Sequence, residues 1–348
     1  MIFTAENTLL IGSILLFVSI VVGKTGYRFG VPTLLLFLVV GMLFGSDGVG
    51  LVFDNYNLVQ FLSIVALCVI LFTGGMETKI KEIRPVLGPG IVLSTAGVLL
   101  TVIFTGLFIF FLSRIEKIGL SLSIVMCFLL AAVMSSTDSA SVFSILKNCN
   151  MRLKQNLRPM LELESGSNDP MAYMLTLLLI AYIQSGGMNI WEAGLSLVIQ
   201  LSVGAIAGFL LGRLAVLIIN KIDIDNESLY PILLLATAFF TFAATTLCKG
   251  NGYLAVYIAG LVVGNAKIVH KKSMGTFFDG FAWLWQIVMF LTLGLLVNPH
   301  ELLPVTGVGV MVGVFMILIA RPISVFLCLI PYKLSLIHIS EPTRHSLI

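Results

Sequence analysis

Eleven apolar stretches follow one another along the chain, and this succession constrains the fold more than any other feature. They cover approximately residues 8–24, 31–45, 57–76, 86–113, 119–147, 160–185, 190–219, 229–248, 252–266, 277–297 and 303–331. A helix needs about 20 apolar residues to cross a hydrocarbon core about 30 Å thick. Only 11% of the 348 residues are charged, which is too few to cover a soluble globule. We therefore predict an all-α membrane protein, a polytopic helix bundle surrounded by lipid.

The distribution of Lys and Arg predicts the orientation of this bundle. The connections after even-numbered stretches hold only Arg114, Lys117 and Lys249, whereas those after odd-numbered stretches are rich in both residue types. Basic connections face the cytoplasm, so the N-terminus is expected outside. The net charge of +3 is too small to indicate a nucleic-acid partner. The five cysteines are scattered singly, a pattern that predicts neither a disulfide framework nor a metal site.

The sequence also resembles itself when it is shifted by 219 residues. Three segments match in this one register: 40–45 with 259–264, 71–76 with 290–295, and 86–90 with 305–309. A shift of 219 residues pairs each predicted helix with the seventh helix after it. Because seven is odd, the two units are expected to lie oppositely in the membrane, an architecture typical of transporters.

This self-similarity predicts how the chain is organised. We expect one transmembrane domain at 1–333, in which a first repeat covers about 8–185 and a linker helix covers about 190–219. A second repeat, at about 229–331, is incomplete, because the partners of the last two helices of the first repeat would begin near the end of the chain. Residues 334–348 resemble a translated sequencing adaptor, and we expect them not to be native.

Ionisable residues reach the middle of the predicted helices, where charge is expensive. Asp138 lies in the fifth stretch and Asp169 in the sixth, both near the middle of the membrane. Glu164 lies shallower on the helix of Asp169, and Arg321 is mid-span in the eleventh stretch. A lone Asp at a helix centre costs roughly 2.5–3.5 kcal/mol on insertion scales. Such residues usually face a cavity, so these are candidate functional residues.

Oxygen-bearing side chains surround the two aspartates. The segment SSTDSAS (135–141) can bond its own backbone in place of the helical ladder, so this helix is expected to unwind. On the next helix, Ser165 and Asp169 share a face, and Pro170 removes a backbone donor. Carboxylate, carbonyl and hydroxyl oxygens suit a small alkali cation, while a desolvated aspartate can instead hold a proton. Competition for one carboxylate would produce exchange. Asn168, in place of a second aspartate, predicts electroneutral one-for-one exchange.

At these residues the sequence resembles a known family. The segments STDSASV (136–142), ESGSNDPMA (164–172) and ARPISVF (320–326) resemble the bacterial NhaP-type cation:proton antiporters, in particular the potassium:proton branch of the monovalent cation:proton antiporter-1 family. The resemblance covers residues from about 8 to 333. It implies thirteen helices, eleven of which are present here, and a mobile six-helix core that rocks against a dimerisation domain.

The resemblance further implies a homodimer in the bacterial inner membrane, with K⁺ or Na⁺ and H⁺ as transported ions and no cofactor. By the family pattern, Asp169, Asp138 and Asn168 carry the exchange. Asp169 and Asp138, together with Thr137 and Ser165, are the implied cation ligands, and Thr137 and Asp138 occupy the crossing of an unwound helix.

The family pattern also implies a structural role for two of the buried charges. Glu164 and Arg321 resemble an ion pair that steadies the core. One position departs from the pattern, because Thr73 stands where family members often carry an acidic residue. The helices that would complete the crossing are expected to be missing from this sequence, which predicts that the fragment alone is inactive.

Two other classes of membrane protein fit part of the sequence. A passive cation channel would need the same polar residues but no proton coupling. An intramembrane aspartyl protease also uses two aspartates on neighbouring helices, but its GxGD signature is missing, since Asp169 follows Ser-Asn. We therefore favour a secondary active transporter over a channel and over an enzyme.

Overall fold

The computed structural model describes residues 5–26, 32–51, 53–115, 122–137, 157–185, 187 and 189–332, which form helices and connections without a β-strand. The α-helices are α1 (Ala5–Gly26), α2 (Thr33–Phe44), α3 (Tyr56–Glu77), α4 (Ile80–Ile83), α5 (Leu87–Val92), α6 (Val98–Ser113), α7 (Ile124–Met134), α9 (Leu157–Ser185), α10 (Ile190–Lys221), α11 (Leu229–Leu247), α12 (Gly252–Asn265), α13 (Lys271–Leu296), α14 (Pro299–Leu302), α15 (Thr306–Phe315) and α16 (Arg321–Leu329). Each of the eleven predicted stretches contains helix. Six helical segments of the described part are long and apolar enough to span a membrane, and shorter apolar helices accompany them.

Polar side chains set the beginnings of several helices. The side chains of Asn55, Ser123, Asn189 and Asn251 accept hydrogen bonds from backbone N–H groups in the first turns of α3, α7, α10 and α12. Such caps satisfy donors that the helical ladder leaves free. The apolar runs therefore start as helices at the positions where the sequence supplies a short polar residue.

Two long helical segments are interrupted in the same way. The segments Ile80–Ser113 and Pro299–Tyr332 each contain 34 residues. Each begins with one turn of α-helix and a 3₁₀ turn that contains a proline, and each later contains a π-helical turn, at Leu93–Gly97 and at Met316–Ala320. The first residues and the prolines of the two segments differ by 219 positions. The spacing found in the sequence therefore recurs in the helix boundaries.

The glycines that match in the repeat lie where helices touch backbone to backbone. A Cβ added at any of four glycines would collide with a carbonyl oxygen of the facing helix, so no larger residue fits without a shift. The contacts are reciprocal. Gly41 lies against the carbonyl of Leu291, and Gly260 lies against the carbonyl of Phe72. In the same way, Gly75 lies against the carbonyl of Tyr257, and Gly294 lies against the carbonyl of Leu38. Each member lies 219 positions from its counterpart. Reciprocal contacts of this kind are what a two-fold relation produces, and they agree with a repeat among the described helices. The bounds of the two repeats and their opposite orientation stay predictions. The count of thirteen helices stays a prediction.

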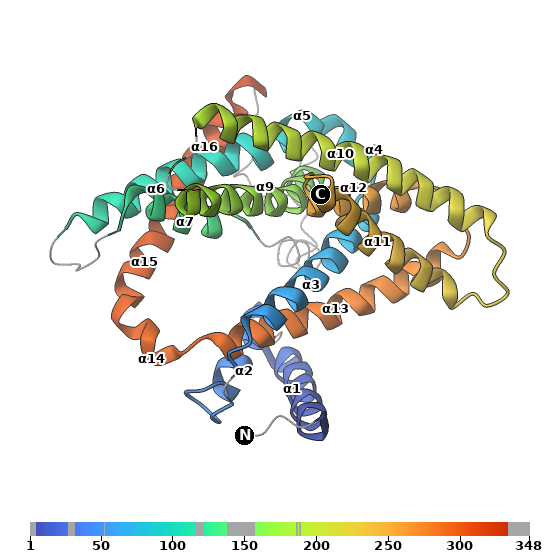
Figure 1. The fold of residues 1–348 in the computed structure, drawn as a ribbon, viewed down its shortest axis with the longest axis horizontal. Coiled ribbons are helices and arrows are strands. Elements are labelled where there is room, and N and C mark those ends of the chain that lie inside the picture. The colour runs from blue at the N-terminus through green and yellow to red at the C-terminus, as the bar shows by residue number, and fades with distance from the viewer. Residues whose placement is uncertain are drawn as a thin grey trace, which may run out of the picture.

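The helices pack as two groups (Figure 1). The first helix group contains α1, α2, α3, α10, α11, α12 and α13, and the second contains α5, α6, α7, α9, α15 and α16. Most packing lies within each group, and α9 of the second group reaches α3 and α12 of the first. The largest core cluster contains buried apolar side chains of α3, α9, α10, α11, α12 and α13, together with Ile83, Val86, Leu93, Cys328 and Leu329. The helix that carries Asp169 thus lies at the junction of the two groups.

Helix α7, which packs against α9, ends before the predicted stretch does. A helix was expected over 119–147, but α7 ends at Met134, and residues 135–137 are not helical. This agrees with the unwinding predicted from the hydroxyl-rich segment. The rest of that segment, including Asp138, lies outside the described residues. By contrast, α9 continues through Pro170 without a break.

Candidate functional site

The polar residues of α9 form two rows on one helix. Glu164 and Asn168 are four positions apart, and so are Ser165 and Asp169, so each pair is stacked along the helix. Ser165 and Asn168 are almost completely inaccessible, at 1% and 0% exposure. Asp169 is only half-buried. Its carboxyl group is therefore the more accessible end of a buried polar cluster.

The non-helical residues after α7 complete this cluster. The Ser136 hydroxyl donates a short hydrogen bond to a carboxylate oxygen of Asp169 and lies 3.4 Å from the amide oxygen of Asn168. Asn168 Nδ2 donates to Thr137 Oγ1 over 2.5 Å, and Thr137 Oγ1 lies 3.5 Å from Ser165 Oγ. The end of α7 thus places two hydroxyl groups against the polar rows of α9.

Asn168 connects the cluster to a buried ion pair. Its Nδ2 lies 3.3 Å from Glu164 Oε1, and the same oxygen accepts a short hydrogen bond from Nη2 of Arg321. Arg321 is the first residue of α16 and follows the π-helical turn Met316–Ala320. The charge of Glu164 is therefore compensated within the cluster, and Asp169 accepts a hydrogen bond from the Ser136 hydroxyl.

The structure brings together most of the residues that the sequence singled out. Thr137, Ser165, Asn168 and Asp169 form one hydrogen-bonded cluster, with the Glu164–Arg321 pair beside it. Asp138 lies outside the described residues, and Thr73 bonds the Val69 carbonyl of its own helix. Ser136 was not singled out, although it belongs to the hydroxyl-rich segment. Its role depends on which hydroxyl of that segment faces α9, and spacing alone does not fix this.

The donor set is a hard-oxygen set. Hydroxyl and carboxylate oxygens of Ser136, Thr137, Ser165 and Asp169 suit a small, hard cation, and a soft metal would need sulfur or imidazole ligands. Within the described ranges, no three His, Cys, Asp or Glu side chains gather as a metal site. A carboxylate that lies among hydroxyl oxygens can take up one unit of positive charge, either a proton or a monovalent cation.

Comparisons with known proteins support the family resemblance. Residues 12–341 match the family model described as the transmembrane sodium/hydrogen exchanger. The K(+)/H(+) antiporter NhaP of Alkalimonas amylolytica is 39% identical over 326 residues, which cover 93% of this chain and 55% of that protein. The K(+)/H(+) antiporter NhaP2 of Shewanella sp. (strain ANA-3) is 38% identical over 328 residues, with the same coverage. The chain thus spans about half the length of these curated relatives.

The fold also matches that of a solved structure. The sodium proton antiporter MjNhaP1 from Methanocaldococcus jannaschii at pH 8 superposes with a TM-score of 0.82 at 23% identity, covering 96% of this chain and 81% of that one. The NhaP-type resemblance inferred from the ESGSNDPMA segment is therefore confirmed at the level of family and fold. The chain belongs to the transmembrane sodium/hydrogen exchanger family.

Proposed function

We propose that this chain is the transmembrane domain of a secondary active transporter that exchanges potassium or sodium for protons. The observation that carries the proposal is the cluster of oxygen-bearing side chains around Asp169, beside the Glu164–Arg321 ion pair. Glu164 forms an ion pair with Arg321, while the Asp169 carboxylate accepts a hydrogen bond from the Ser136 hydroxyl just after the end of α7. In this proposal, Asp169 supplies the one exchangeable negative charge. Similarity to proteins named K(+)/H(+) antiporters favours potassium as the cation.

In the proposed mechanism, a proton and a cation compete for Asp169. Binding of either neutralises the carboxylate, so the loaded site carries the same net charge in both directions and exchange is electroneutral. Asn168 supplies an amide where a second carboxylate would bind a second proton. Asp138 and the hydroxyls of Thr137 and Ser165 would contribute further cation ligands.

Alternating access would follow from movement of the second helix group against the first. Asp169 lies on α9, at the junction of the groups, so such a movement would open the site to each side in turn. We place the transporter in the bacterial inner membrane as a homodimer with its N-terminus outside, since the connections richest in Lys and Arg would then face the cytoplasm. The domain would extend over 1–333, with the two repeats joined by the linker helix α10.

The experiment that tests this function uses inverted membrane vesicles and a pH-sensitive dye, with variants made in the complete gene. Adding K⁺ or Na⁺ should collapse a preformed proton gradient in vesicles with the unaltered transporter and not with Asp169→Asn. Asp47→Asn, a carboxylate removed from a surface turn, serves as the matched control and should retain exchange. Exchange that persists in Asp169→Asn would refute the role of Asp169. Cation flux without proton movement would identify a channel instead.

A further inference from the structure

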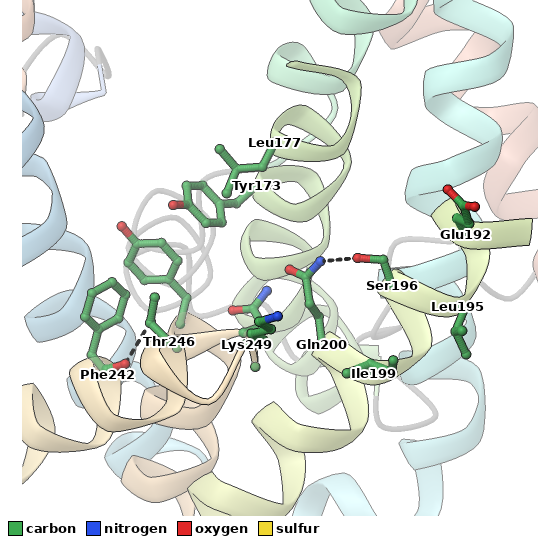
Figure 2. Close-up of a pocket in the computed structure, with 14 residues that line it drawn as sticks. Tyr173, Leu177, Glu192, Leu195, Ser196, Ile199, Gln200, Phe242, Thr246 and Lys249 are labelled. Atoms are coloured by element: carbon green, nitrogen blue, oxygen red, sulfur yellow. Dashed lines mark hydrogen bonds between the residues drawn. The ribbon is translucent and has the colours of Figure 1, made fainter. Parts of the chain in front are cut away.

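A cavity of about 410 Å³ lies next to the helix that carries Asp169 (Figure 2). It is bounded by α9, by the first half of α10 and by the turn from α11 to α12. Polar groups from all of these elements line it, among them Ser196, Gln200, Thr246 and Asn251. Figure 2 shows Gln200 and Ser196 joined by a hydrogen bond on α10. A lining of this mixture can hold water as well as apolar groups.

The cavity lies toward one end of the bundle. Its lining comes from residues near two connections, 186–189 between α9 and α10 and 248–251 between α11 and α12. Both connections follow even-numbered predicted spans, which are poor in Lys and Arg. In the proposed orientation, the cavity therefore opens toward the outside of the cell.

Asn251 lines this cavity and bonds to the helix of Asp169. Its side chain is 4% exposed, and Nδ2 donates to the Pro170 carbonyl oxygen over 3.0 Å. Its backbone N–H bonds the Gln200 carbonyl, and its Oδ1 accepts from the Leu254 N–H as the cap of α12. One buried residue thus connects α9, α10 and α12. Because Pro170 follows Asp169 directly, this connection lies beside the proposed ion site.

Two tyrosines that line the cavity form a further contact between α9 and α12. The rings of Tyr173 and Tyr253 meet edge to face, with centroids 4.8 Å apart. Tyr173 lies one turn after Asp169 on α9, and Tyr253 lies two residues after Asn251 on α12 and is buried. Both contacts join the second helix group to the first, so any relative movement of the groups must alter them.

We propose that this cavity is the outer access route to Asp169 and that Asn251 is the positioning residue of its gate. With the Asn251–Pro170 bond formed and the tyrosines in contact, Asp169 is closed to the outside. Breaking the bond lets α9 move away from α12 and joins the cavity to the site. This inference rests on the proposed function and assigns to Asn251 the control of outward access. The equivalent position of the first repeat is Pro32, which has no side-chain donor, so the gate belongs to one repeat only.

Substitution of Asn251 by aspartate removes its bond to Pro170 and leaves its cap of α12 in place. Asn251→Asp keeps the size of the side chain and the oxygen that caps α12, but it removes the Nδ2 donor and sets a carboxylate oxygen against the Pro170 carbonyl. Asn251→Ser also keeps a capping oxygen and is too short to reach Pro170. Asn265→Ala is the matched control, because Asn265 lies at the other end of α12 and bonds the Thr78 and Leu261 carbonyls.

Thiol labelling from the outside measures the gate directly. Ser165→Cys reports on the ion site and Ser196→Cys on the cavity, each in a complete transporter whose native cysteines are replaced. A membrane-impermeant thiol reagent is added to right-side-out vesicles. We expect Ser196→Cys to react in every background. Ser165→Cys should react roughly tenfold faster with Asn251→Asp or Asn251→Ser, since a lost buried hydrogen bond shifts a two-state equilibrium by about this factor, and no faster with Asn265→Ala.

Two results would overturn the gate. One is an unchanged Ser165→Cys rate in both Asn251 variants, and the other is a Ser196→Cys that does not react from the outside. Neither result depends on transport. If the labelling results overturn the gate but Asp169→Asn abolishes ion exchange, the proposed function still stands. Conversely, exchange that survives in Asp169→Asn would refute the proposed function, and the labelling rates would still test whether Asn251 controls access.

Discussion

Of the three carboxylates on α9, Glu164 and Asp169 belong to the polar cluster and lie five positions apart. Glu164 is buried and ion-paired, and Arg321 brings the only formal positive charge that the described residues place against it. A buried pair adds little net stability over an apolar pair, but removal of one partner leaves an uncompensated charge. Replacing one partner of the pair should therefore lower the stability of the protein, whereas replacing both partners should largely restore it.

Arg321→Leu should lower the free energy of unfolding by about 3–5 kcal/mol, because Glu164 then remains buried without a counter-charge. The double variant Glu164→Leu/Arg321→Leu should recover most of this loss. Thermal unfolding of the purified protein in detergent measures both. A double variant as unstable as Arg321→Leu alone would contradict the ion-pair account.

The residues of the site were predictable in part. Depth in an apolar helix identified Asp169, Glu164 and Arg321, because a charge there is too costly without a role. Ser136 and Asn251 were not identified. Both are polar residues of common types, and their importance arises from contacts with α9 that join positions far apart in the sequence.

At the scale of helices, backbone contact between α2 and α13 and between α3 and α12 depends on glycine. Four glycines occupy these crossings as two reciprocal pairs. Glycine patterns in one register predicted the repeat, whereas the division of Ile80–Ser113 and Pro299–Tyr332 into α, 3₁₀ and π turns was not predicted. A continuous apolar run gives no signal for such changes, because an apolar side chain reaches every face whichever way a turn rotates it.

Gly41→Ala and Gly260→Ala should each lower stability by about 1–3 kcal/mol, because the added methyl group overlaps a carbonyl of the facing helix. Gly194→Ala on α10 is the matched control. A Cβ there meets nothing within 4 Å, so the substitution should stabilise the helix by about 0.5–1 kcal/mol. Thermal unfolding compares the three. Equal melting temperatures for all three variants would refute the close approach of the backbones.

The turn after α2 is bonded to α14 through Asp47. Its carboxylate accepts the backbone N–H of His300 over 2.9 Å and lies 2.6 Å from the ring Nδ1. These bonds, the backbone bond first, hold the pKa of Asp47 below its usual 3.8. A lowered pKa favours the folded state above pH 3.8, and this contribution is lost as the pH falls through the lower folded value.

We expect His300→Ala to raise the pKa of Asp47 part of the way to its usual value, because the ring bond is lost and the backbone bond remains. Carboxyl carbon NMR of selectively labelled protein across acidic pH follows this titration. Asp54, which lies in a separate connection, provides a reference signal from the same molecule. A pKa of Asp47 that does not move would show that the ring makes no contribution.

At the scale of the whole molecule, the two helix groups meet along α9, with the proposed ion site and the proposed outer gate on the same helix. The helix order and the repeat followed from hydrophobic length and a common register, which are properties of the sequence itself. The grouping of helices did not, because it depends on which apolar faces pack together, and nearly every face of these helices is apolar.

The central claim is that one carboxylate binds a proton or a cation, but never both. The apparent cation affinity then depends on the deprotonated fraction of Asp169. The direct measurement is the KM for K⁺, or for Na⁺, in vesicles at a series of pH values with the maximal rate recorded. Below the pKa of the site, the account predicts that KM rises by about tenfold for each unit of pH decrease while the maximal rate stays constant. A KM that does not change with pH, with protonation altering only the maximal rate, would contradict it.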